Sequence, residues 1–482
     1  MKILPIPFVI VLLVLTGRGF DANAQTETNL YSFVGSPNDG RYPYAALVQG
    51  SDGNFYGTTA GGGNGPCPGG CGTVFRVSPS GAYTTLYSFV GYPTDGQSPN
   101  AGLVQGSDSN FYGTTVEGGS GNCIVNGCGT IFRISPSGNE TNLYSFESSS
   151  THDGFYPSAG LVQGRDGNFY GTTAGGGTDG AGTVFRISAG GTYTTLYSFV
   201  SYPTDGAGPS GALVQGSDGN FYGTTSSGGT NSEEGGAVFR ISPSGSETNL
   251  YSFPGSLNDG VTPEGGLVPG SDGNFYGTTY SGGMYSSGTV FQITRSGSET
   301  YLYAFGGVAS DGANPIAGLV QGSDGNFYGT TQFGGTNACQ CGTVFRISTN
   351  AFYTRLYSFV GSPNDGANPQ AGLVQGSDGN FYGTTEKGGT NNDGTVFRFF
   401  VPLNPPANQI SRIGLVGTNV VLAIPSVAGE TYQLQFTTNL TSGIWSSIPG
   451  VSVTNSIGSI LTLTNFAGAN QPRGFYRFAI TP

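Results

Sequence analysis

The sequence predicts an all-β fold, a seven-bladed β-propeller with four-stranded blades followed by a small β-sandwich. The motif Asp-Gly-Asn-Phe-Tyr-Gly-Thr-Thr recurs roughly every 50–60 residues, as one stacked supersecondary unit would. Each unit also holds four short apolar segments bounded by turn residues. Neighbouring apolar residues such as Phe55 and Tyr56 must face opposite sides of a strand, so both faces of each sheet are predicted to be buried. The seven copies begin at Asp52, Asp108 (with Ser109 in place of glycine), Asp166, Asp218, Asp272, Asp324 and Asp378.

The four apolar segments of a unit are predicted to be antiparallel strands. In chain order they read Leu-Tyr-Ser-Phe (30–33), Leu-Val-Gln-Gly (47–50), Asn-Phe-Tyr-Gly-Thr-Thr (54–59) and Gly-Thr-Val-Phe-Arg-Ile (182–187 in the third unit). Aromatic and β-branched residues between Gly, Pro, Ser and Asp are typical of strands. Asp-Gly between the second and third segments indicates a tight hairpin.

The order of the segments predicts how the ring closes. With 47–50 innermost and 30–33 outermost, the chain begins with an outer strand that its last unit lacks. Residues 30–33 are therefore expected to pair with 396–399, which removes a free sheet edge. Gly57 and its counterparts are expected to let adjacent blades approach closely. A β-solenoid is the alternative, but its coils are usually shorter than about 30 residues.

The two ends of the chain differ from the repeat region, 28–400. Residues 1–24 combine Lys2, an apolar run over 3–15 and Ala22-Asn23-Ala24, which indicates a cleaved secretory signal peptide. Residues 401–409 contain three prolines and are predicted to be a linker. Residues 410–482 are predicted to form the sandwich, with strands at 420–424, 432–436, 460–463 and 475–480 and Trp445 in its core.

Charge restricts the possible partners. The chain has 16 Lys and Arg against 28 Asp and Glu, a net charge of −12, and only 9% of its residues are charged. An acidic protein does not release counterions from phosphates, so nucleic acid is not expected as a partner. No membrane span is expected once the signal peptide is removed, and we expect an exported monomer.

The repeat resembles a known family. The series Gly-Leu-Val-Gln-Gly-Ser-Asp-Gly-Asn-Phe-Tyr-Gly-Thr-Thr, then Gly-Thr-Val-Phe-Arg-Ile and Leu-Tyr-Ser-Phe, is similar to the GloVer (Gloeo/Verruco) tandem repeat of exported bacterial "choice-of-anchor" proteins. The resemblance implies an extracytoplasmic location and no established activity. In the tail, Ala-Gly-Glu-Thr-Tyr-Gln-Leu-Gln and Gly-Phe-Tyr-Arg resemble fibronectin-III-like modules.

Aspartate recurs twice in every unit. Besides the hairpin aspartates, each unit carries an Asp-Gly-x-x-Pro segment, at Asp39, Asp95, Asp153, Asp205, Asp259, Asp311 and Asp365. A residue present in every blade is expected to serve the blade, here by capping turn amides. Calcium bound by repeated carboxylates is the alternative, although the 12-residue loop with alternating oxygen ligands is absent. Glu140, Glu247 and Glu299 share one turn position and are expected to be solvated.

Candidate binding residues follow the second Thr of the motif, where the units differ. The loops there and the connections between blades should emerge on one face, opposite the tight turns, and variable loops on a rigid scaffold commonly bind ligands. Tyr280 and Phe333 are candidates to stack on a sugar ring, and Glu117, Glu386 and Lys387 to bind its hydroxyls. Drift at exposed positions is the alternative. Glu117 and Glu386 are also a conceivable glycosidase carboxylate pair.

Six cysteines lie in three local pairs on this predicted face. In an exported chain we expect disulfides between Cys67 and Cys71, Cys123 and Cys128, and Cys339 and Cys341, the last one strained. A zinc site is the alternative, but it would need ligands from separate blades. His152 is the single histidine and has no partner motif for a triad, so it is expected to be a surface turn residue.

The sequence therefore favours a non-enzymatic, exported binding or scaffold protein that recognises a glycan or an extracellular protein through its acidic loop face. The alternative is a secreted carbohydrate-active hydrolase or lyase with a site at the mouth of the propeller channel. A purely structural role in a cell-surface layer is a third possibility. No cofactor is expected, with Ca²⁺ as the one candidate.

Overall fold

The computed structural model describes residues 27–37, 39–123, 126–147, 153–231, 235–255, 259–308 and 310–401, together with six strands between 412 and 481. Contacts between Cα atoms separate a compact unit, Gln25–Phe400, from a second one that includes Val401–Pro482. The two units are described one at a time. The predicted signal peptide, most of the linker, His152 and Trp445 lie outside the described residues.

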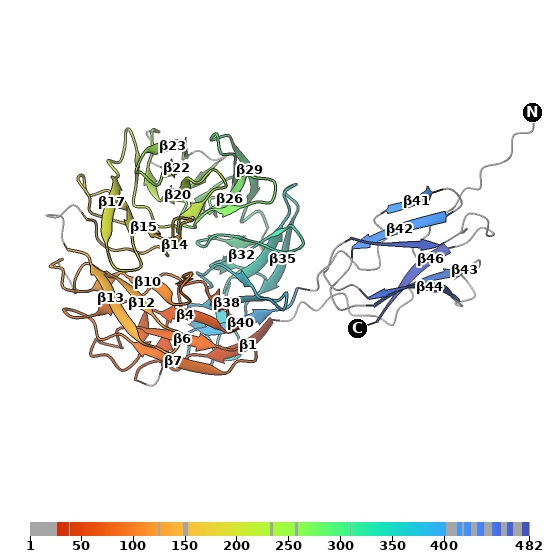
Figure 1. Ribbon diagram of the computed structural model, residues 1–482, viewed down its shortest axis with the longest axis horizontal. Helices are drawn as coiled ribbons and strands as arrows, with labels where there is room; N and C mark the ends of the chain where they lie inside the picture. The colour runs from red at the N-terminus through yellow and green to blue at the C-terminus, as the bar shows by residue number, and fades with distance from the viewer. Residues whose placement is uncertain are drawn as a thin grey trace, which may run out of the picture. The chain divides into compact units, whose positions relative to one another are not determined.

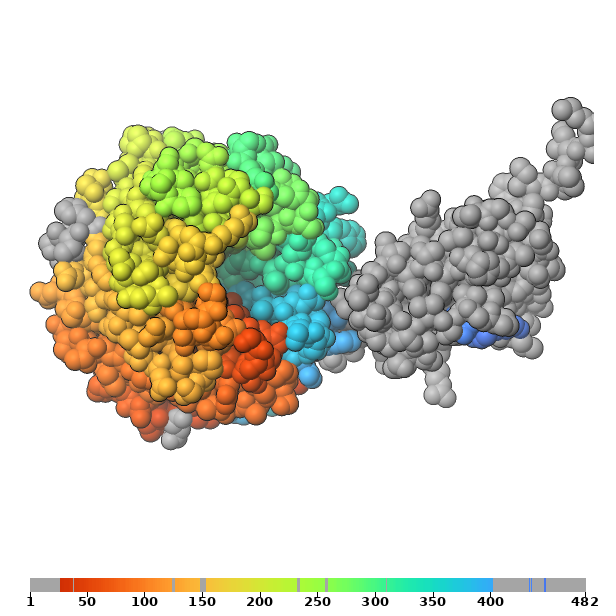
Figure 2. Space-filling view, viewed as in Figure 1, coloured from red at the N-terminus to blue at the C-terminus, as the bar shows by residue number. Residues whose placement is uncertain are grey.

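The first unit is a ring of seven four-stranded antiparallel sheets, a seven-bladed β-propeller as the sequence predicts (Figure 1). Blades are numbered here by their innermost strands: β3 (Val48–Gln49), β9 (Val104–Gln105), β14 (Val162–Gln163), β19 (Val214–Gln215), β25 (Val268–Pro269), β31 (Val320–Gln321) and β37 (Val374–Gln375). These strands are only two residues long, shorter than the predicted four-residue segments. The ring surrounds a central hollow, visible in Figure 2.

The second and third strands of each blade are longer and almost fully buried. The second strands are β4 (Phe55–Thr59), β10 (Phe111–Thr115), β15 (Phe169–Thr173), β20 (Phe221–Thr225), β26 (Phe275–Thr279), β32 (Phe327–Thr331) and β38 (Phe381–Thr385). The third strands are β6 (Thr73–Val77), β12 (Thr130–Ile134), β16 (Thr183–Ile187), β22 (Ala237–Ile241), β28 (Thr289–Ile293), β34 (Thr343–Ile347) and β40 (Thr395–Phe399).

The outermost strands confirm the predicted closure. Six of them follow their own blade in the chain: β7 (Tyr83–Ser88), β13 (Glu140–Ser145), β17 (Tyr193–Ser198), β23 (Glu247–Ser252), β29 (Glu299–Ala304) and β35 (Tyr353–Ser358). Blade 7 instead takes β1 (Glu27–Ser32), which pairs antiparallel with β40. The pairing runs from Glu27 opposite Phe399 to Ser32 opposite Thr395, so it begins earlier than the predicted 30–33.

Aromatic stacking joins each blade to the next. Tyr56 of blade 1 stacks on Phe111 of blade 2 with ring centroids 4.0 Å apart, and Phe55 stacks on Tyr382 of blade 7. These rings are almost completely buried, so both faces of each sheet are apolar as predicted. A stack of this kind adds about 0.5–1.5 kcal/mol beyond the buried area. The remaining ring pairs are Tyr112–Phe169, Tyr170–Phe221 and Tyr276–Phe327, which stack, and Tyr222–Phe275 and Tyr328–Phe381, which are tilted.

The prediction that Gly57 makes room for the adjacent blade is wrong, because its close neighbours lie in its own blade. A Cβ on Gly57 would lie 2.6 Å from Cζ of Phe75 and 2.8 Å from Cδ2 of Leu47. Both side chains belong to blade 1 itself, and Phe75 is the cross-strand partner of Gly57. The glycine therefore makes room for an aromatic ring within its own sheet, not for the neighbouring blade.

A ring of glutamines links the innermost strands across blades. Gln105 of blade 2 accepts a hydrogen bond from the backbone N–H of Ser51 in blade 1, at 3.0 Å. Equivalent bonds run from Ser107 to Gln163, Arg165 to Gln215, Ser271 to Gln321, Ser323 to Gln375 and Ser377 to Gln49. Blade 5 has Pro269 in place of the glutamine. The backbone N–H of Ser217 in blade 4 therefore has no glutamine acceptor in this series.

Small two-stranded sheets place two kinds of loop on one face, called the loop face here. The segment that enters a blade pairs with the residues that follow its second strand, as in β2 (Gly40–Arg41) with β5 (Gly61–Gly62). This confirms that inter-blade connections and the loops after Thr-Thr emerge together. The other pairs are β8 (Gly96–Gln97) with β11 (Glu117–Gly118), β18 (Gly206–Ala207) with β21 (Ser227–Gly228), β24 (Gly260–Val261) with β27 (Ser281–Gly282), β30 (Gly312–Ala313) with β33 (Phe333–Gly334), and β36 (Gly366–Ala367) with β39 (Lys387–Gly388).

The described strands of the second unit form two three-stranded antiparallel sheets. One contains β41 (Arg412–Val416), β42 (Asn419–Pro425) and β45 (Ile460–Asn465), and the other contains β44 (Ser446–Thr454), β43 (Thr431–Thr437) and β46 (Phe475–Thr481). Four of these strands were predicted from the sequence, whereas β41 and β44 were not. Among the described residues, no helix is long and apolar enough to cross a membrane.

Candidate functional site

The hairpin aspartates cap their turns, as predicted. Oδ1 of Asp52 accepts the backbone N–H of Asn54, and Oδ2 accepts the side-chain amide of Asn54 and the hydroxyl of Tyr56, at 2.7 and 2.9 Å. Burial alone would raise the pKa of Asp52, but these hydrogen bonds outweigh it and lower the pKa below its usual value. The same contacts repeat around the ring, so these carboxylates hold hairpins and leave little capacity for a ligand.

The Asp-Gly-x-x-Pro aspartates are buried, each with at most 7% of its surface exposed. Oδ2 of Asp39 accepts the hydroxyl of Tyr31 at 2.7 Å, and Oδ1 accepts the backbone N–H of Gly40 at 2.6 Å. The side chain thus joins an outermost strand to the connection that enters the next blade. This extends the predicted turn capping, because the tyrosine partner was not anticipated.

In each connection that enters a blade, the residue just before the proline has a left-handed backbone. Tyr42, with φ of 58°, receives the N–H of Ala60 on its carbonyl and donates its own N–H to the carbonyl of Asp393. This residue therefore ties the position after Thr-Thr to a loop of the preceding blade. The counterparts are Ser98, Tyr156, Gly208, Thr262, Asn314 and Asn368. Their residue types vary, so no sequence pattern marks the positive φ at this position.

Three of the sequence-predicted site residues lie on the loop face in blades 2, 5 and 6. Glu117 in blade 2 accepts a hydrogen bond from the side chain of Gln97 at 2.7 Å. The carbonyl of Tyr280 in blade 5 accepts the side-chain amide of Asn314 at 3.0 Å. Phe333 in blade 6 is 39% exposed. Tyr280 and Phe333 therefore lie near each other where blade 5 meets blade 6, because Phe333 pairs with Ala313, the chain neighbour of Asn314, whereas Glu117 belongs to blade 2.

Glu386 and Lys387, the other two candidates, belong to a cluster where blade 7 meets blade 1. The Glu386 side chain is 12% exposed, and its Oε1 lies 3.6 Å from Nζ of Lys387. Its Oε2 accepts the side-chain amide of Gln370 at 2.5 Å. Burial raises the pKa of Tyr44, and the adjacent Glu386 carboxylate raises it further. A carboxylate is thus held among a cation, an amide and a phenol.

Aromatic rings and an arginine extend this cluster along blade 1. The rings of Tyr42 and Tyr44 stack with centroids 6.3 Å apart, and the guanidinium of Arg41 lies 5.0 Å from the centroid of Tyr42. Nε of Arg41 is buried without a hydrogen-bond partner. We call Arg41, Tyr42, Tyr44, Gln370, Glu386 and Lys387 the 7–1 cluster. Tyr44 and Gln370 were missed from the sequence, although they occupy the same variable position after the proline of their units.

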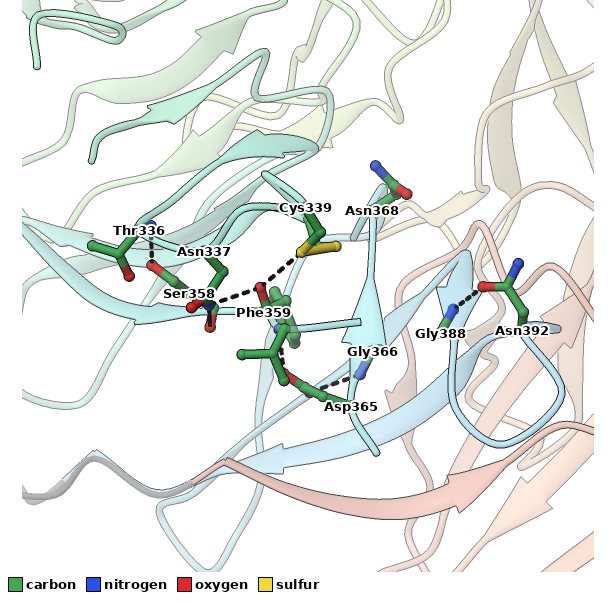
Figure 3. Close-up of a disulfide and its surroundings, with 12 residues drawn as sticks. Thr336, Asn337, Cys339, Ser358, Phe359, Asp365, Gly366, Asn368, Gly388 and Asn392 are labelled. Carbon is green, nitrogen blue, oxygen red and sulfur yellow. Dashed lines mark hydrogen bonds between the residues drawn. A yellow bond between two sulfur atoms is a disulfide. The ribbon is translucent and has the colours of Figure 1, made fainter. Parts of the chain in front are cut away.

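All three predicted disulfides are present, joining Cys67 to Cys71, Cys123 to Cys128 and Cys339 to Cys341. Each one closes a short loop on the loop face. Beside the third, the side-chain amide of Asn337 donates to the carbonyls of Ser358 and Phe359 (Figure 3). The Cys67–Cys71 loop has a further role, because its Gly69 packs against the guanidinium of Arg41 in the 7–1 cluster.

The predicted solvation of Glu140, Glu247 and Glu299 is wrong. These glutamates begin outermost strands and are partly buried against the preceding blade. Burial, followed by the nearby charges of Asp95, Asp205 and Asp259 respectively, raises the pKa of each to about 7. The sequence places them after a surface turn, and nothing local marks the preceding blade as their neighbour. No group of three or more His, Cys, Asp or Glu able to hold a metal ion occurs among the described residues.

Several solved structures resemble this chain at low sequence identity. A lectin from Burkholderia pseudomallei is 11% identical, covers 74% of this chain and 99% of its own, and has a TM-score of 0.49. A protein of unknown function from Dyadobacter fermentans is 12% identical, covers 78% of this chain and 99% of its own, and has a TM-score of 0.42. An extracellular domain assigned to a hybrid two-component system of B. thetaiotaomicron is 12% identical, with a TM-score of 0.48. The match covers 94% of this chain, and this chain spans only 57% of the length of that extracellular domain.

Sequence comparison with curated proteins finds no match. The family model described as "Gloeobacter/Verrucomicrobia repeat" matches residues 19–235 and 209–405, which together include all seven blades. The match ends at residue 405 and includes none of the described strands of the second unit, so a fibronectin-III-like character there stays a prediction. On the strength of the propeller repeat, the chain belongs to the Gloeobacter/Verrucomicrobia repeat family.

Proposed function

We propose that this protein is a non-enzymatic, extracytoplasmic binding protein that recognises a glycan through the 7–1 cluster. The observation that carries the proposal is the largely buried Glu386 carboxylate, held by Gln370 and Lys387 beside two tyrosine rings. Such a group combines oriented polar side chains with aromatic surface, as small-ligand sites commonly do.

The chemistry of the cluster suits a polyhydroxylated ligand. A carboxylate accepts hydrogen bonds from sugar hydroxyls, while amide and ammonium groups donate to sugar oxygens. The partly exposed rings of Tyr42 and Tyr44 offer apolar faces with a polar edge, on which a sugar ring can stack. Because the other six blade junctions lack this set of side chains, one site per propeller is proposed.

Two further observations support parts of the proposal. Three disulfides are typical of oxidising, extracytoplasmic compartments. Glycoside hydrolysis generally requires two carboxyl groups flanking the scissile bond. Glu117, the partner suggested for Glu386 by the sequence, lies in blade 2 with blade 1 between them and is bound to Gln97. The hydrolase alternative is therefore less well supported than binding.

A glycan array on the full chain tests the proposal. We expect at least one glycan to bind, and Glu386→Gln to weaken that binding about tenfold or more, since a charge-assisted hydrogen bond is worth roughly 1.5–3 kcal/mol. Glu117→Gln removes a carboxylate paired with a glutamine in another blade and is the matched control, expected to bind as wild type. Absence of any bound glycan, or equal losses in both variants, would contradict the proposal. Cleavage of the bound glycan would favour the hydrolase.

A further inference from the structure

The first residue of each outermost strand lies at the junction with the preceding blade, and it is either tyrosine or glutamate. Tyrosine stands there in three blades, and each ring stacks on a tyrosine of the preceding blade: Tyr83 on Tyr31, Tyr193 on Tyr144 and Tyr353 on Tyr303, with centroids 4.0, 4.1 and 4.0 Å apart. Glutamate stands there in the other four blades, as Glu27, Glu140, Glu247 and Glu299. The ring therefore contains three tyrosine junctions and four glutamate junctions.

Each glutamate junction leaves a carboxyl oxygen without a hydrogen-bond donor. Oε1 of all four glutamates is buried and unpaired. The donors around it are already engaged, as the junction of blades 1 and 2 illustrates. The hydroxyl of Tyr87 donates to Oδ2 of Asp95 at 2.9 Å, and the N–H groups of Val90 and Gly96 donate to the same carboxylate. An ionised Glu140 would therefore add a second negative charge beside Asp95, and the Tyr87 hydroxyl, which favours the charged form, already donates to Asp95.

Within the described residues, no cation offsets this charge. The titratable groups that act on Glu140 are Asp95 and Tyr87 of the preceding blade and its connection. Glu247 meets Asp205 and Tyr197, Glu299 meets Asp259 and Tyr251, and Glu27 meets Asp365 and Tyr357. No lysine or arginine is among the groups acting on these four carboxyls within the described part of the chain.

We propose that the four glutamate junctions are proton-dependent contacts, closed when the glutamate is protonated and loosened when it ionises. A protonated glutamate carries no charge, and its carboxyl O–H can donate a hydrogen bond to the neighbouring aspartate. Ionisation places two carboxylates side by side in a partly buried junction, and their repulsion favours separation of the outermost strand from the preceding blade. Among the described residues, the three tyrosine junctions hold a stacked pair of tyrosines in place of the glutamate, and we expect them to stay closed.

The direction of the pH dependence follows from the raised pKa values. Burial and the adjacent aspartate raise the pKa of Glu140, Glu247 and Glu299 from 4.5 to about 7, and that of Glu27 to about 8. A raised pKa in the folded state means that the closed junction binds a proton more tightly than the open junction does. The resulting stability is complete below pH 4.5 and is lost as the pH rises through about 7, or about 8 for Glu27.

Amide hydrogen exchange of the full chain, followed by mass spectrometry between pH 5 and pH 9, tests this inference. After correction for the intrinsic exchange rate, we expect β1, β13, β23 and β29 to open more as the pH rises. One proton per junction corresponds to at most about a tenfold change in opening per pH unit, and the change is confined to the interval between pH 4.5 and the raised pKa of about 7, or about 8 for Glu27. The strands β7, β17 and β35 are internal controls and should not change. Equal pH dependence of all seven outermost strands, or none in any, would overturn the inference.

Two substitutions at one junction sharpen the test. Glu140→Gln keeps the shape and removes the titration, so β13 alone should lose its pH dependence while β1, β23 and β29 keep theirs. Glu140→Tyr installs the residue that the chain itself uses at three junctions, and it should give the same result. If β13 stays pH-dependent in a folded variant, a group other than Glu140 is responsible and the proposal fails.

Discussion

At the scale of single residues, each blade is stabilised by a cross-strand pair in which a glycine leaves room for the aromatic ring opposite it. Gly57 and Phe75 are cross-strand partners, and the Phe75 ring lies over the glycine. The ring in turn contacts Phe33 of the closing strand at 5.3 Å between centroids. A strand glycine usually weakens a sheet, but here an aromatic partner covers it and compensates.

Gly57→Ala should therefore destabilise the propeller by about 1–3 kcal/mol, because the added methyl has no room beside Phe75 and Leu47. The measurement is the shift of the unfolding midpoint in denaturant. Gly53→Ala is the control: φ is +81° but nothing lies within 4 Å of its Cβ, so only backbone strain is introduced. Combining Gly57→Ala with Phe75→Leu should cost less than the sum of the two single changes. Strict additivity would contradict the explanation.

At the scale of elements, the innermost strands are too short to hold the ring through their own pairing. Each has two residues, and the glutamine ring supplies hydrogen bonds between blades that the strands cannot. The missing link falls between blades 4 and 5, where proline replaces glutamine. Proline is tolerated there because an edge strand needs no N–H donor on its free side.

Pro269→Gln should restore the missing bond from the N–H of Ser217. We expect slower amide exchange at Ser217 and a gain in stability of about 0.5–1 kcal/mol, the usual net contribution of one hydrogen bond. Gln321→Ala is the reverse control, since it removes the acceptor of Ser271 and should speed exchange there. Unchanged protection of Ser217 in the Pro269 variant would show that the glutamine cannot reach it.

At the scale of the whole molecule, one strand completes the ring. Pairing of β1 with β40 covers Val396 and Phe397, which are fully buried. Without β1, blade 7 would expose an unpaired edge and apolar side chains, a combination that promotes aggregation.

A chain beginning at residue 34 should consequently aggregate or lose native far-ultraviolet circular dichroism and elute early on size exclusion. A peptide spanning residues 25–34 added in excess should restore part of the monomer by completing the sheet. A chain ending at residue 400 keeps every propeller strand and is expected to remain folded. A monomeric, fully folded chain without β1 would contradict the importance of this closure.

Most of the fold could be predicted because the repeat supplies the same information seven times. Segment lengths, Asp-Gly hairpins and paired apolar residues such as Phe55 and Tyr56 each depend on local geometry alone. The candidate site was only partly predictable. Glu386 and Lys387 were identified by their variability. Gln370 reaches Glu386 from the connection that enters the same blade, and Tyr44 joins them only when blades 7 and 1 meet. The burial of Glu140 likewise depends on a neighbouring blade, which no local pattern specifies.

The pairing of residue 27 with residue 399 also has a consequence in time. The first strand of the propeller to be made is the last to find its partner, since β40 follows all the other propeller strands in the chain. Contacts this distant in sequence close slowly, because much chain entropy is lost before they form. Six blades can assemble in order during synthesis, while β1 has to wait unpaired. Completion of the ring is thus delayed until nearly the entire repeat region has been produced, which makes the unpaired first strand the most vulnerable part of the nascent propeller.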